Sequence, residues 1–536
     1  MARPFCYESR AMNRPRPELP PTEPFTQDEL RRTIEVLEAI VRDRALLSTI
    51  DTPDRVALMQ AAGRVSRPTR HEQVRAKKAF RKIERHQTKA MDRSARAATE
   101  IRTSRLAPVF VAPLQIGPGE ARASQEAEER ELRQPRNCYV CKAEYRRLHF
   151  FYDAMCPDCS ELNYAKRFQT AKLQGKTALI TGARLKIGFQ ASLMMLRAGA
   201  RVIVTTRFAH DAATRYARVA DYDAWASRLS VHGLDLRHAP SVEIFARYLL
   251  HTEPRLDILI NNAAQTVRRP PGFYAHLLER EAMAHAALGD KERPLLAAYE
   301  ACKAALSGSA LLPARAGVES NMALASFQGA APGVGIRSPA LMSQIPCTFD
   351  DSARGVDVFP PGETDADLQQ IDLRPVNSWR LTLADVPTPE MLEVQLVNAV
   401  APFILCSKLK PLMMREATFD KHIVNVSAME GSFSRHTKTD KHPHTNMAKA
   451  ALNMMTLTSA PDYAQAGIFM NAVDTGWVTD EDPAAFVTRK QSVHDFQPPL
   501  DIVDGAARVC DPFFSGLNNG VHVWGKFLKD YRATPW

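Results

Sequence analysis

Residues 175–188 read Gly-Lys-Thr-Ala-Leu-Ile-Thr-Gly-Ala-Arg-Leu-Lys-Ile-Gly, and this stretch decides the fold. Thr177–Ile180 is a short apolar run, typical of a strand that is buried on both faces. Thr181–Gly188 is a glycine-bearing turn, and Phe189–Arg197 then shows apolar residues at helical spacing. A strand, a glycine turn and a helix in this order open a dinucleotide-binding fold, because the turn lets the backbone approach a pyrophosphate at the helix N-terminus.

Three more strand patterns follow the opening unit, with helical patterns between them. One is Ala200–Thr205, one ends near Asp235, and one is Leu256–Ala263. Alternating strands and helices indicate βαβ units and a parallel sheet. The sequence therefore predicts an α/β protein with a doubly wound parallel sheet, preceded by an N-terminal helical region and a small zinc-binding module.

These residues resemble the fingerprint of the short-chain dehydrogenase/reductase family, which is Thr-Gly-x-x-x-Gly-x-Gly, Asp after the third strand, and Asn-Asn-Ala-Gly. The chain supplies, in order, Thr181, Gly182, Gly188, Asp235, Asn261, Asn262 and Ala263. Their joint occurrence at family spacing is specific, whereas a glycine turn alone is weak. The resemblance implies a nicotinamide dinucleotide held by Thr181, Gly182, Arg184, Lys186, Ile187, Gly188, Arg207, Asp235, Asn262, Ala263, Lys449, Thr475, Gly476 and Val478.

The resemblance resumes after residue 380 and includes the catalytic landmarks. Val394–Phe403 looks like the family's helix with the catalytic Asn, and Lys421–Gly431 looks like the strand that ends in the catalytic Ser. Pro443–Met455 looks like the helix of Tyr-x-x-x-Lys, and Asn471–Thr479 looks like the segment that closes over nicotinamide. The candidate catalytic residues are Asn398, Ser427, Thr445, Lys449 and His444. In the family, the Tyr phenol exchanges a proton while hydride moves to or from nicotinamide, and the Lys lowers the pKa of that phenol.

Thr445 stands where the family has its tyrosine, four residues before Lys449. An aliphatic hydroxyl is far less acidic than a phenol, so another donor or a loss of turnover must be considered. His444 or His442 is one alternative, because imidazole titrates near pH 6.5. The segment Tyr299-Glu-Ala-Cys-Lys303 offers a phenol, although it precedes Asn398 and so has the wrong order for the family.

Two further departures affect the cofactor loops. Lys186 replaces the middle glycine of the fingerprint, and Thr475 replaces the proline before Gly476. The second strand is followed by Arg207 and by no acidic residue that would bond a ribose 2′-hydroxyl. An arginine at this place suits a 2′-phosphate, so we expect NADP in preference to NAD.

Two Cys-x-x-Cys pairs, Cys138/Cys141 and Cys156/Cys159, are separated by fourteen residues. This spacing places four thiolates around a tetrahedral Zn²⁺ and leaves no position for water, which predicts a structural zinc site. The remaining five cysteines are scattered, at positions 6, 302, 347, 406 and 510, and no secretory signal is apparent. The pattern favours metal binding over disulfides, and we expect a reducing, cytoplasmic location.

The predicted domain organisation has four parts. They are a basic, partly disordered helical region at 1–136, the four-cysteine module at 137–168, a Rossmann-like domain formed by 169–270 with 380–534, and an insertion at 271–379. The insertion follows the fourth strand, at the sheet edge where ligands bind, so a substrate lid is our hypothesis. Residues 64–105 hold 14 basic and four acidic side chains, a net charge of +10.

The sequence therefore predicts an NAD(P)-dependent oxidoreductase that acts on a small-molecule carbonyl or alcohol. The principal alternative is a non-catalytic NADP-binding regulatory or scaffold protein. Nucleic-acid binding through the basic helices is a weaker alternative, because Phe80 is the only Phe, Tyr or Trp among the charges of residues 64–105 that could stack on a base. We expect no membrane partner, since no apolar run approaches about 18 residues. The family resemblance suggests a homo-oligomer, and the sequence does not fix the oligomeric state.

Overall fold

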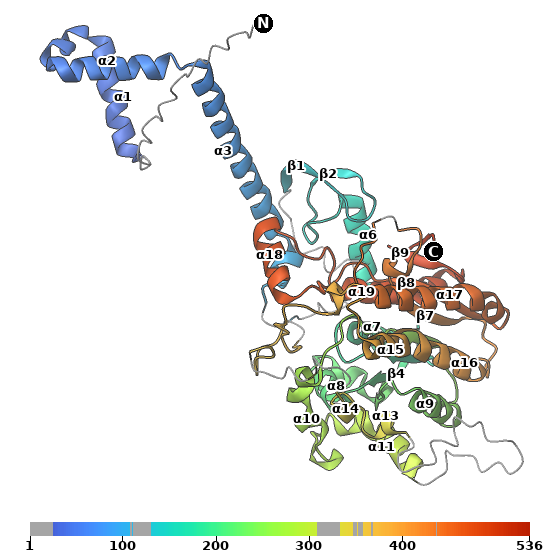
Figure 1. Cartoon of the computed structure of the whole chain (residues 1–536). Coiled ribbons are helices and arrows are strands. Elements are labelled where there is room, and N and C mark those ends of the chain that lie inside the picture. The colour runs from blue at the N-terminus through green and yellow to red at the C-terminus, as the bar shows by residue number, and fades with distance from the viewer. Residues whose placement is uncertain are drawn as a thin grey trace, which may run out of the picture. The chain divides into compact units, whose positions relative to one another are not determined.

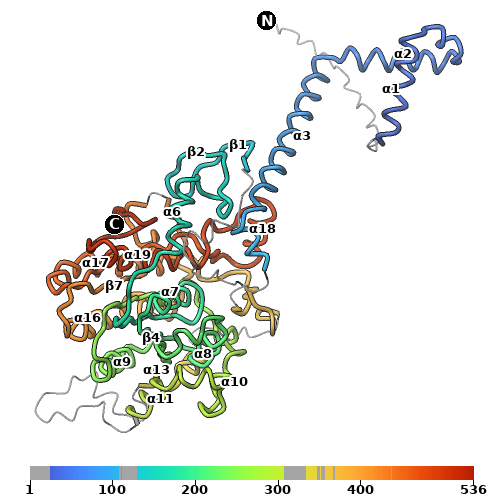
Figure 2. Tube along the Cα trace, turned by 180° about the vertical axis from the view of Figure 1, so that it is seen from behind, coloured from blue at the N-terminus to red at the C-terminus, as the bar shows by residue number. Residues whose placement is uncertain are grey.

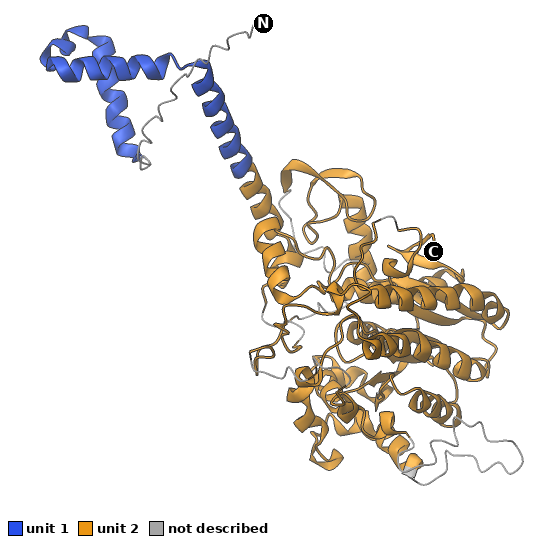
Figure 3. Cartoon of the chain, in the orientation of Figure 1, with its two compact units in different colours: residues 1–87 blue, residues 88–536 orange. Residues whose placement is uncertain are grey.

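A computed structural model describes residues 25–107, 110, 130–307, 333–346, 351, 357–365, 368–435 and 437–536. The proline-rich segment 1–24, residues 108–109 and 111–129, Cys6 and Cys347 lie outside the described residues. The chain forms two compact units, residues 1–87 and 88–536, shown in different colours in Figure 3. The predicted N-terminal region 1–136 is therefore divided between the two units.

The first unit consists of α1 (Gln27–Arg42), a 3₁₀ turn, α2 (Thr52–Ser66) and the first part of α3 (Arg70–Ala97). Thr26 and Glu29 form a capping box at the start of α1, in which each side chain accepts a hydrogen bond from the backbone N–H of the other residue. None of the described side chains of α1, α2 or α3 is buried.

The second unit is built on an eight-stranded sheet with the order β10-β9-β8-β7-β6-β3-β4-β5 (Figure 1). Seven strands are parallel, and only the edge strand β10 is antiparallel. The strands are β3 (Thr177–Thr181), β4 (Arg201–Thr206), β5 (Leu229–Gly233), β6 (Ile258–Asn261), β7 (Lys421–Ser427), β8 (Ile468–Asp474), β9 (Phe527–Lys529) and β10 (Arg532–Thr534). The order reverses between β3 and β6, which creates the switch point where open α/β sheets bind ligands.

Helices cover both faces of this sheet, which confirms the doubly wound fold (Figures 1 and 2). On one side α7 packs against α19, and on the other α9 packs against α16 and α15 against α17. Their bounds are α7 (Lys186–Arg197), α8 (Ala209–Ala217), α9 (Ala239–Thr252), α15 (Thr388–Gln395), α16 (Ala401–Met413), α17 (Pro443–Gln465), α18 (Ala484–His494) and α19 (Ile502–Asn519). Every residue of β3, β5, β6 and β7 is buried, as a sheet covered on both faces requires.

A five-residue π-helical turn, Leu396–Val400, joins α15 to α16. The continuous stretch Thr388–Met413 is the one described helix whose length and composition would suit a membrane span. Of its apolar window, 56% is buried inside the protein.

The four-cysteine module packs directly against the Rossmann-like core. It consists of the hairpin β1 (Glu131–Asn137) and β2 (Glu144–Arg147) followed by α6 (Pro157–Arg167). Helix α6 lies against α19, where Arg167 forms ion pairs of 2.8 Å with both Asp501 and Asp504 at the start of that helix. All three of these side chains are buried, so the module is anchored by charge as well as by packing.

The described helices of the insertion lie mostly at the β5 edge of the sheet. They are α10 (Ala275–Glu281), α11 (Arg293–Ser307), α13 (Val334–Arg337) and α14 (Pro339–Met342). Helix α11 packs on β5, α10 on α8, and α13 on α9. The end of the insertion, near Trp379, reaches the side of the sheet that carries Ser427. The described helices thus extend the sheet edge, and a lid over a substrate stays a hypothesis.

Candidate active site

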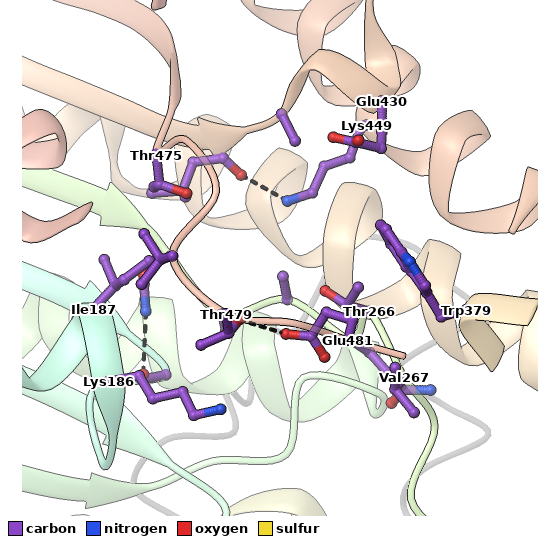
Figure 4. Close-up of a pocket in the computed structure, with 18 of the residues that line it drawn as sticks. Lys186, Ile187, Thr266, Val267, Trp379, Glu430, Lys449, Thr475, Thr479 and Glu481 are labelled. Atoms are coloured by element: carbon purple, nitrogen blue, oxygen red, sulfur yellow. Dashed lines mark hydrogen bonds between the residues drawn. The ribbon is translucent and has the colours of Figure 1, made fainter. Parts of the chain in front are cut away.

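A cavity of about 1130 Å³ opens at the carboxyl ends of the parallel strands (Figure 4). It is larger than the roughly 300–1,000 Å³ typical of small-ligand sites, so it has room for an extended cofactor beside a substrate. Of the predicted cofactor residues, all except Thr181 line it: Gly182, Arg184, Lys186, Ile187, Gly188, Arg207, Asp235, Asn262, Ala263, Lys449, Thr475, Gly476 and Val478.

Thr181 lies beneath the cavity and ties the glycine turn to the loop after β6. Its Oγ1 accepts hydrogen bonds from the backbone N–H groups of Asn262 (3.1 Å) and Ala263 (3.0 Å). Gly182 has φ +68°, and a Cβ there would come within 2.8 Å of the Cα of Ala263. A Cβ on Gly188 would lie 2.4 Å from Nδ2 of Asn262. Both glycines are therefore required by close approach of the backbone.

Lys186 is the first residue of α7 and adopts φ +54°. This left-handed conformation is the one that glycine adopts without a steric penalty, which explains why the family fingerprint has glycine here. The lysine replacement keeps the turn and adds a positive charge at the N-terminus of α7, where an anion is already favoured by the helix dipole.

Arg184, Lys186 and Arg207 differ in whether a carboxylate of the protein pairs with their charge. Arg184 is buried and forms a 2.7 Å ion pair with Asp211, and burial lowers the pKa of its guanidinium. Arg207 instead donates a 2.6 Å hydrogen bond to the hydroxyl of Tyr274 and stacks over that ring. Within the described part of the chain, no carboxylate pairs with Arg207 or with Lys186. These two cations are the better placed to meet a phosphate.

Asp235 lines the cavity, but its carboxylate is already bound. Arg237 contacts it with two nitrogens, at 2.7 Å for Nη2, and also bonds Glu393 at 2.8 Å. Burial would raise the pKa of Asp235, but Arg237 holds it below its usual value. No local pattern in the sequence indicates this arrangement, because Glu393 is distant in the chain.

Ser427 and Lys449 line the same cavity as Arg207, from β7 and α17. Ser427 ends β7, and its hydroxyl donates a 2.5 Å hydrogen bond to Oδ1 of Asn453. Lys449 lies on α17 and donates a 2.7 Å hydrogen bond to the carbonyl of Val426 (Figure 4). Burial lowers the pKa of Lys449 to about 8, so its charge is lost at mildly alkaline pH.

Asn398 lies within the π-helical turn and does not line the cavity. Its Oδ1 accepts from the backbone N–H of Gln265 at 2.7 Å, and its Nδ2 donates to the carbonyl of the same residue at 3.2 Å. Gln265 itself lines the cavity. Asn398 therefore shapes the loop after β6 in this structure, and the π turn sets the direction of its side chain.

Three candidate proton donors lie away from the cavity. Thr445 is buried and its hydroxyl has no hydrogen-bond partner among the described residues. His444 is buried on α17 with its Nε2 3.3 Å from a carboxylate oxygen of Glu390. Tyr299 lies on α11, where its hydroxyl bonds the carbonyl of Ile336. The phenol of Tyr299 and the imidazole of His444 are thus engaged elsewhere.

His442, the remaining candidate, does line the cavity together with Ser427 and Lys449. It precedes α17 in a left-handed conformation, with φ +43°, so its side chain is not directed by the helix. Its ring stacks on Trp379 and its Nδ1 lies 3.1 Å from Oδ1 of Asn446, which also lines the cavity. Neither Trp379 nor Asn446 was singled out by the sequence.

The loop after β8 is fixed by a carboxylate and by the cysteine module. Asp474 accepts hydrogen bonds from the N–H groups of Gly476 and Met429, both at 2.7 Å. The next N–H, of Trp477, donates to the hydroxyl of Tyr139 at 2.9 Å. Tyr139 lies between the first two cysteines and lines the cavity.

The sulfur atoms of Cys138, Cys141, Cys156 and Cys159 all lie within 4.8 Å of one another. The sulfurs of Cys141 and Cys156 are 3.7 Å apart. Four thiolates around zinc at about 2.3 Å require sulfur–sulfur edges of about 3.8 Å, so the cluster fits the ion. The pKa of the Cys141 thiol is lowered to about 7, chiefly because the backbone N–H of Ala143 donates a hydrogen bond to its sulfur. Hydrogen bonds with the neighbouring thiols lower this pKa further.

Two protein-family models match the two halves of this domain. The model described as short chain dehydrogenase matches residues 176–285, and the one described as enoyl-(acyl carrier protein) reductase matches residues 377–498. The chain is a divergent member of the short-chain dehydrogenase/reductase family.

Individual relatives differ in how much of the chain they match. Uncharacterized protein R665 of Acanthamoeba polyphaga mimivirus is 28% identical over 410 residues, which are 74% of each chain. Retinol dehydrogenase 14 of Mus musculus is 43% identical over 100 residues, covering 17% of this chain and 30% of the relative. Dehydrogenase/reductase SDR family member 13 of Bos taurus is 39% identical over 93 residues, 17% and 24% of the two lengths. The matches to these two dehydrogenases thus span less than a third of their length.

Solved structures also resemble the chain at low identity. The RhlG/NADP active-site complex of Pseudomonas aeruginosa aligns at 17% identity and a TM-score of 0.39, covering 67% of this chain and 95% of that one. A short chain dehydrogenase of Burkholderia cenocepacia in complex with NADP aligns at 17% identity and a TM-score of 0.38, covering 67% and 96%.

Proposed function

We propose that this protein is an NADP-dependent oxidoreductase that reduces a carbonyl group or oxidises an alcohol. The observation that carries the proposal is one cavity that joins the glycine turn at Gly182 and Gly188 to Ser427 and Lys449. The cofactor, when bound, supplies or accepts the hydride. The chain's own groups hold the reactants: the N-terminus of α7 receives the pyrophosphate, Lys449 binds ribose, and Ser427 orients the substrate oxygen.

The preference for NADP rests on Arg207. This guanidinium lies after β4, where a ribose 2′-substituent is bound in doubly wound folds, and Tyr274 holds it by a hydrogen bond and stacking. A planar guanidinium matches a phosphate with two donors, whereas a 2′-hydroxyl needs an acceptor. Asp235 does not supply that acceptor, because Arg237 occupies its carboxylate. NAD remains the weaker cofactor in this proposal.

His442 is the proton donor that we propose for this site in place of the family's tyrosine. It lines the cavity with Ser427 and Lys449, whereas Thr445 and His444 do not. If Nδ1 carries its proton toward Asn446, Nε2 is the nitrogen that exchanges a proton with the substrate oxygen. The distance from Nδ1 to Oδ1 of Asn446, 3.1 Å, supports this orientation.

The experiment measures cofactor binding and hydride transfer separately. Purified protein is titrated with NADPH and NADH by fluorescence, and NADPH deuterated at C4 is then incubated with a panel of aliphatic and aromatic carbonyls. Deuterium in an alcohol product supports the oxidoreductase. Absence of measurable affinity for either dinucleotide overturns both the activity and the cofactor assignment.

A second candidate is a protein that binds NADP without redox turnover. Thr445 favours it, because the residue at the family's acid position is a buried aliphatic hydroxyl that does not line the cavity. Tight NADPH binding with no deuterium transfer to any carbonyl of the panel supports this candidate over the first.

We also propose that the four-cysteine cluster holds a structural Zn²⁺. Four thiolates fill a tetrahedral coordination sphere and leave no position for a reacting water. The support for the ion is the mutual distance of the four sulfurs, since hairpin β1–β2 and the start of α6 bring them together in the described structure. The site thus belongs to the architecture of the protein and not to hydride chemistry.

A further inference from the structure

The four-cysteine module contributes a side chain to the wall of the dinucleotide cavity. Tyr139 occupies the turn between Cys138 and Cys141, and its backbone N–H bonds the carbonyl of Ala154, just before Cys156. Its hydroxyl accepts the N–H of Trp477 at 2.9 Å. The two halves of the cysteine cluster therefore set the position of the Tyr139 hydroxyl. This hydroxyl in turn fixes the loop that follows β8 and lines the cavity.

The same module also holds α19. Tyr152 donates a hydrogen bond to Asp504, and Arg508 bonds Asn163 at 2.6 Å, in addition to the ion pairs of Arg167. All of these side chains are buried. Helix α19 packs in turn against α7, whose first residues line the cavity. Two independent connections thus run from the cysteine module to the cofactor-binding loops.

We propose that Zn²⁺ bound by the four cysteines positions the dinucleotide site through Tyr139, so that metal occupancy sets the affinity for the cofactor. A hairpin and one short helix bury little apolar surface, so the module depends on the ion and on its docking to α19 to keep its shape. Tyr139 is a positioning residue, because it acts through the backbone of Trp477. The coupling rests on the proposed dinucleotide binding, whereas the metal site does not.

The metal is tested on the full chain without reference to activity. Protein expressed with added zinc is analysed for metal content, with one Zn²⁺ per chain expected, and cobalt replacement is expected to give the visible absorption of tetrahedral thiolate coordination. Cys138→Ser combined with Cys156→Ser removes one ligand from each pair and abolishes both signals. Cys302→Ala, a change outside the cluster, keeps them. Zinc-free folded wild-type protein overturns the metal site.

The coupling is tested with two matched tyrosine variants. Tyr139→Phe removes the acceptor for the Trp477 N–H, and Tyr145→Phe removes a similar bond, from its hydroxyl to the carbonyl of Asp153, inside the module and away from the cavity. Both variants keep one Zn²⁺ per chain. Tyr139→Phe weakens NADPH binding by roughly three- to tenfold, as expected for one lost hydrogen bond. Tyr145→Phe leaves the dissociation constant unchanged.

A turnover measurement separates positioning from general damage. Tyr139→Phe raises the KM for NADPH and leaves kcat nearly unchanged once the cofactor saturates, whereas removal of zinc by chelation raises that KM at least as much. Equal NADPH affinity of wild type, Tyr139→Phe and the zinc-depleted protein overturns the coupling and leaves the oxidoreductase standing. Failure of wild-type, zinc-loaded protein to bind any dinucleotide overturns the proposed function and the coupling together.

Discussion

The imidazole of His442 lies face to face with the indole of Trp379, with 3.8 Å between ring centroids and 6° between the ring planes. Trp379 comes from the end of the insertion, and His442 immediately precedes the helix that bears Lys449. The stack holds an imidazole at the wall of the cavity that Ser427 also lines. Through this contact a residue of the insertion packs against the proton donor that we propose.

His442 should be required for the proton transfer and not for cofactor binding. We expect His442→Gln to lower kcat for carbonyl reduction by about 10²- to 10⁴-fold, the usual contribution of a positioned general acid, with unchanged NADPH affinity. His251→Gln, an exposed histidine on α9, is the matched control. Steady-state kinetics and fluorescence titration check both parameters, and an unimpaired His442→Gln enzyme would remove His442 from the mechanism.

The pH dependence of reduction should follow the protonated form of His442. Burial lowers the pKa of this imidazole from 6.5, so the cation that donates a proton is populated only at pH values below 6.5. We expect kcat for carbonyl reduction to rise as the pH falls through that pKa, and kcat for alcohol oxidation to rise in the opposite direction. A pH profile of His442→Gln that retains the same acidic limb would contradict this assignment.

Lys449 should limit the alkaline side of the profile. Its pKa is lowered by burial to about 8, so the ammonium that we propose binds ribose is lost above that pH, well before an exposed lysine would titrate. We expect the KM for NADPH to increase above pH 8. In Lys449→Met this increase disappears and cofactor binding is weak at every pH. Cofactor titrations from pH 6 to pH 10 provide the measurement.

Arg207 should determine the choice between the two dinucleotides. We expect Arg207→Ala to weaken NADPH binding by roughly 10- to 100-fold, the effect of losing charge-assisted hydrogen bonds, and to leave NADH binding nearly unchanged. Arg228→Ala, an arginine outside the cavity, is the control. A parallel loss of both affinities would mean that Arg207 supports the fold and does not read the 2′-phosphate.

Gly182 and Gly175 provide a matched pair for the strain in the glycine turn. Both have positive φ, +68° and +76°, but a Cβ at Gly175 meets nothing within 4 Å. We expect Gly175→Ala to lower the free energy of unfolding by about 1 kcal/mol, from the left-handed conformation alone. Gly182→Ala adds the overlap with Ala263 and should cost about 3 kcal/mol or more. Denaturant unfolding of the two variants compares them directly.

The order of strands and the glycine turn could be predicted because their signals are local. The apolar run at Thr177–Ile180 and the spacing of the glycines depend on residues that are neighbours in the chain, and the close approach at Gly182 and Gly188 explains them. The two Cys-x-x-Cys pairs are equally local, and their sulfurs do meet. The sequence therefore predicted most of the residues that line this end of the cavity, and their binding of a cofactor stays a prediction.

The catalytic side was less predictable because its members come from separate parts of the chain. His442 and His444 are two residues apart, and Pro443 between them indicates where the helix begins. In the structure His442, in the turn before α17, lines the cavity, whereas His444, on the helix, lies against Glu390. The hydrogen bond from Arg237, which also binds Asp235, to Glu393 and the contact between Tyr139 and Trp477 likewise join residues from distant segments.

The sequence by itself determined the doubly wound sheet, the glycine turn and the cysteine cluster, because short-range periodicity and spacing are sufficient to specify them. Only the tertiary structure decided which histidine faces the cavity, which arginine keeps its charge available, and that the cysteine module forms part of the wall. These depend on the directions and ion-pair partners of side chains, which are fixed only when segments hundreds of residues apart pack together.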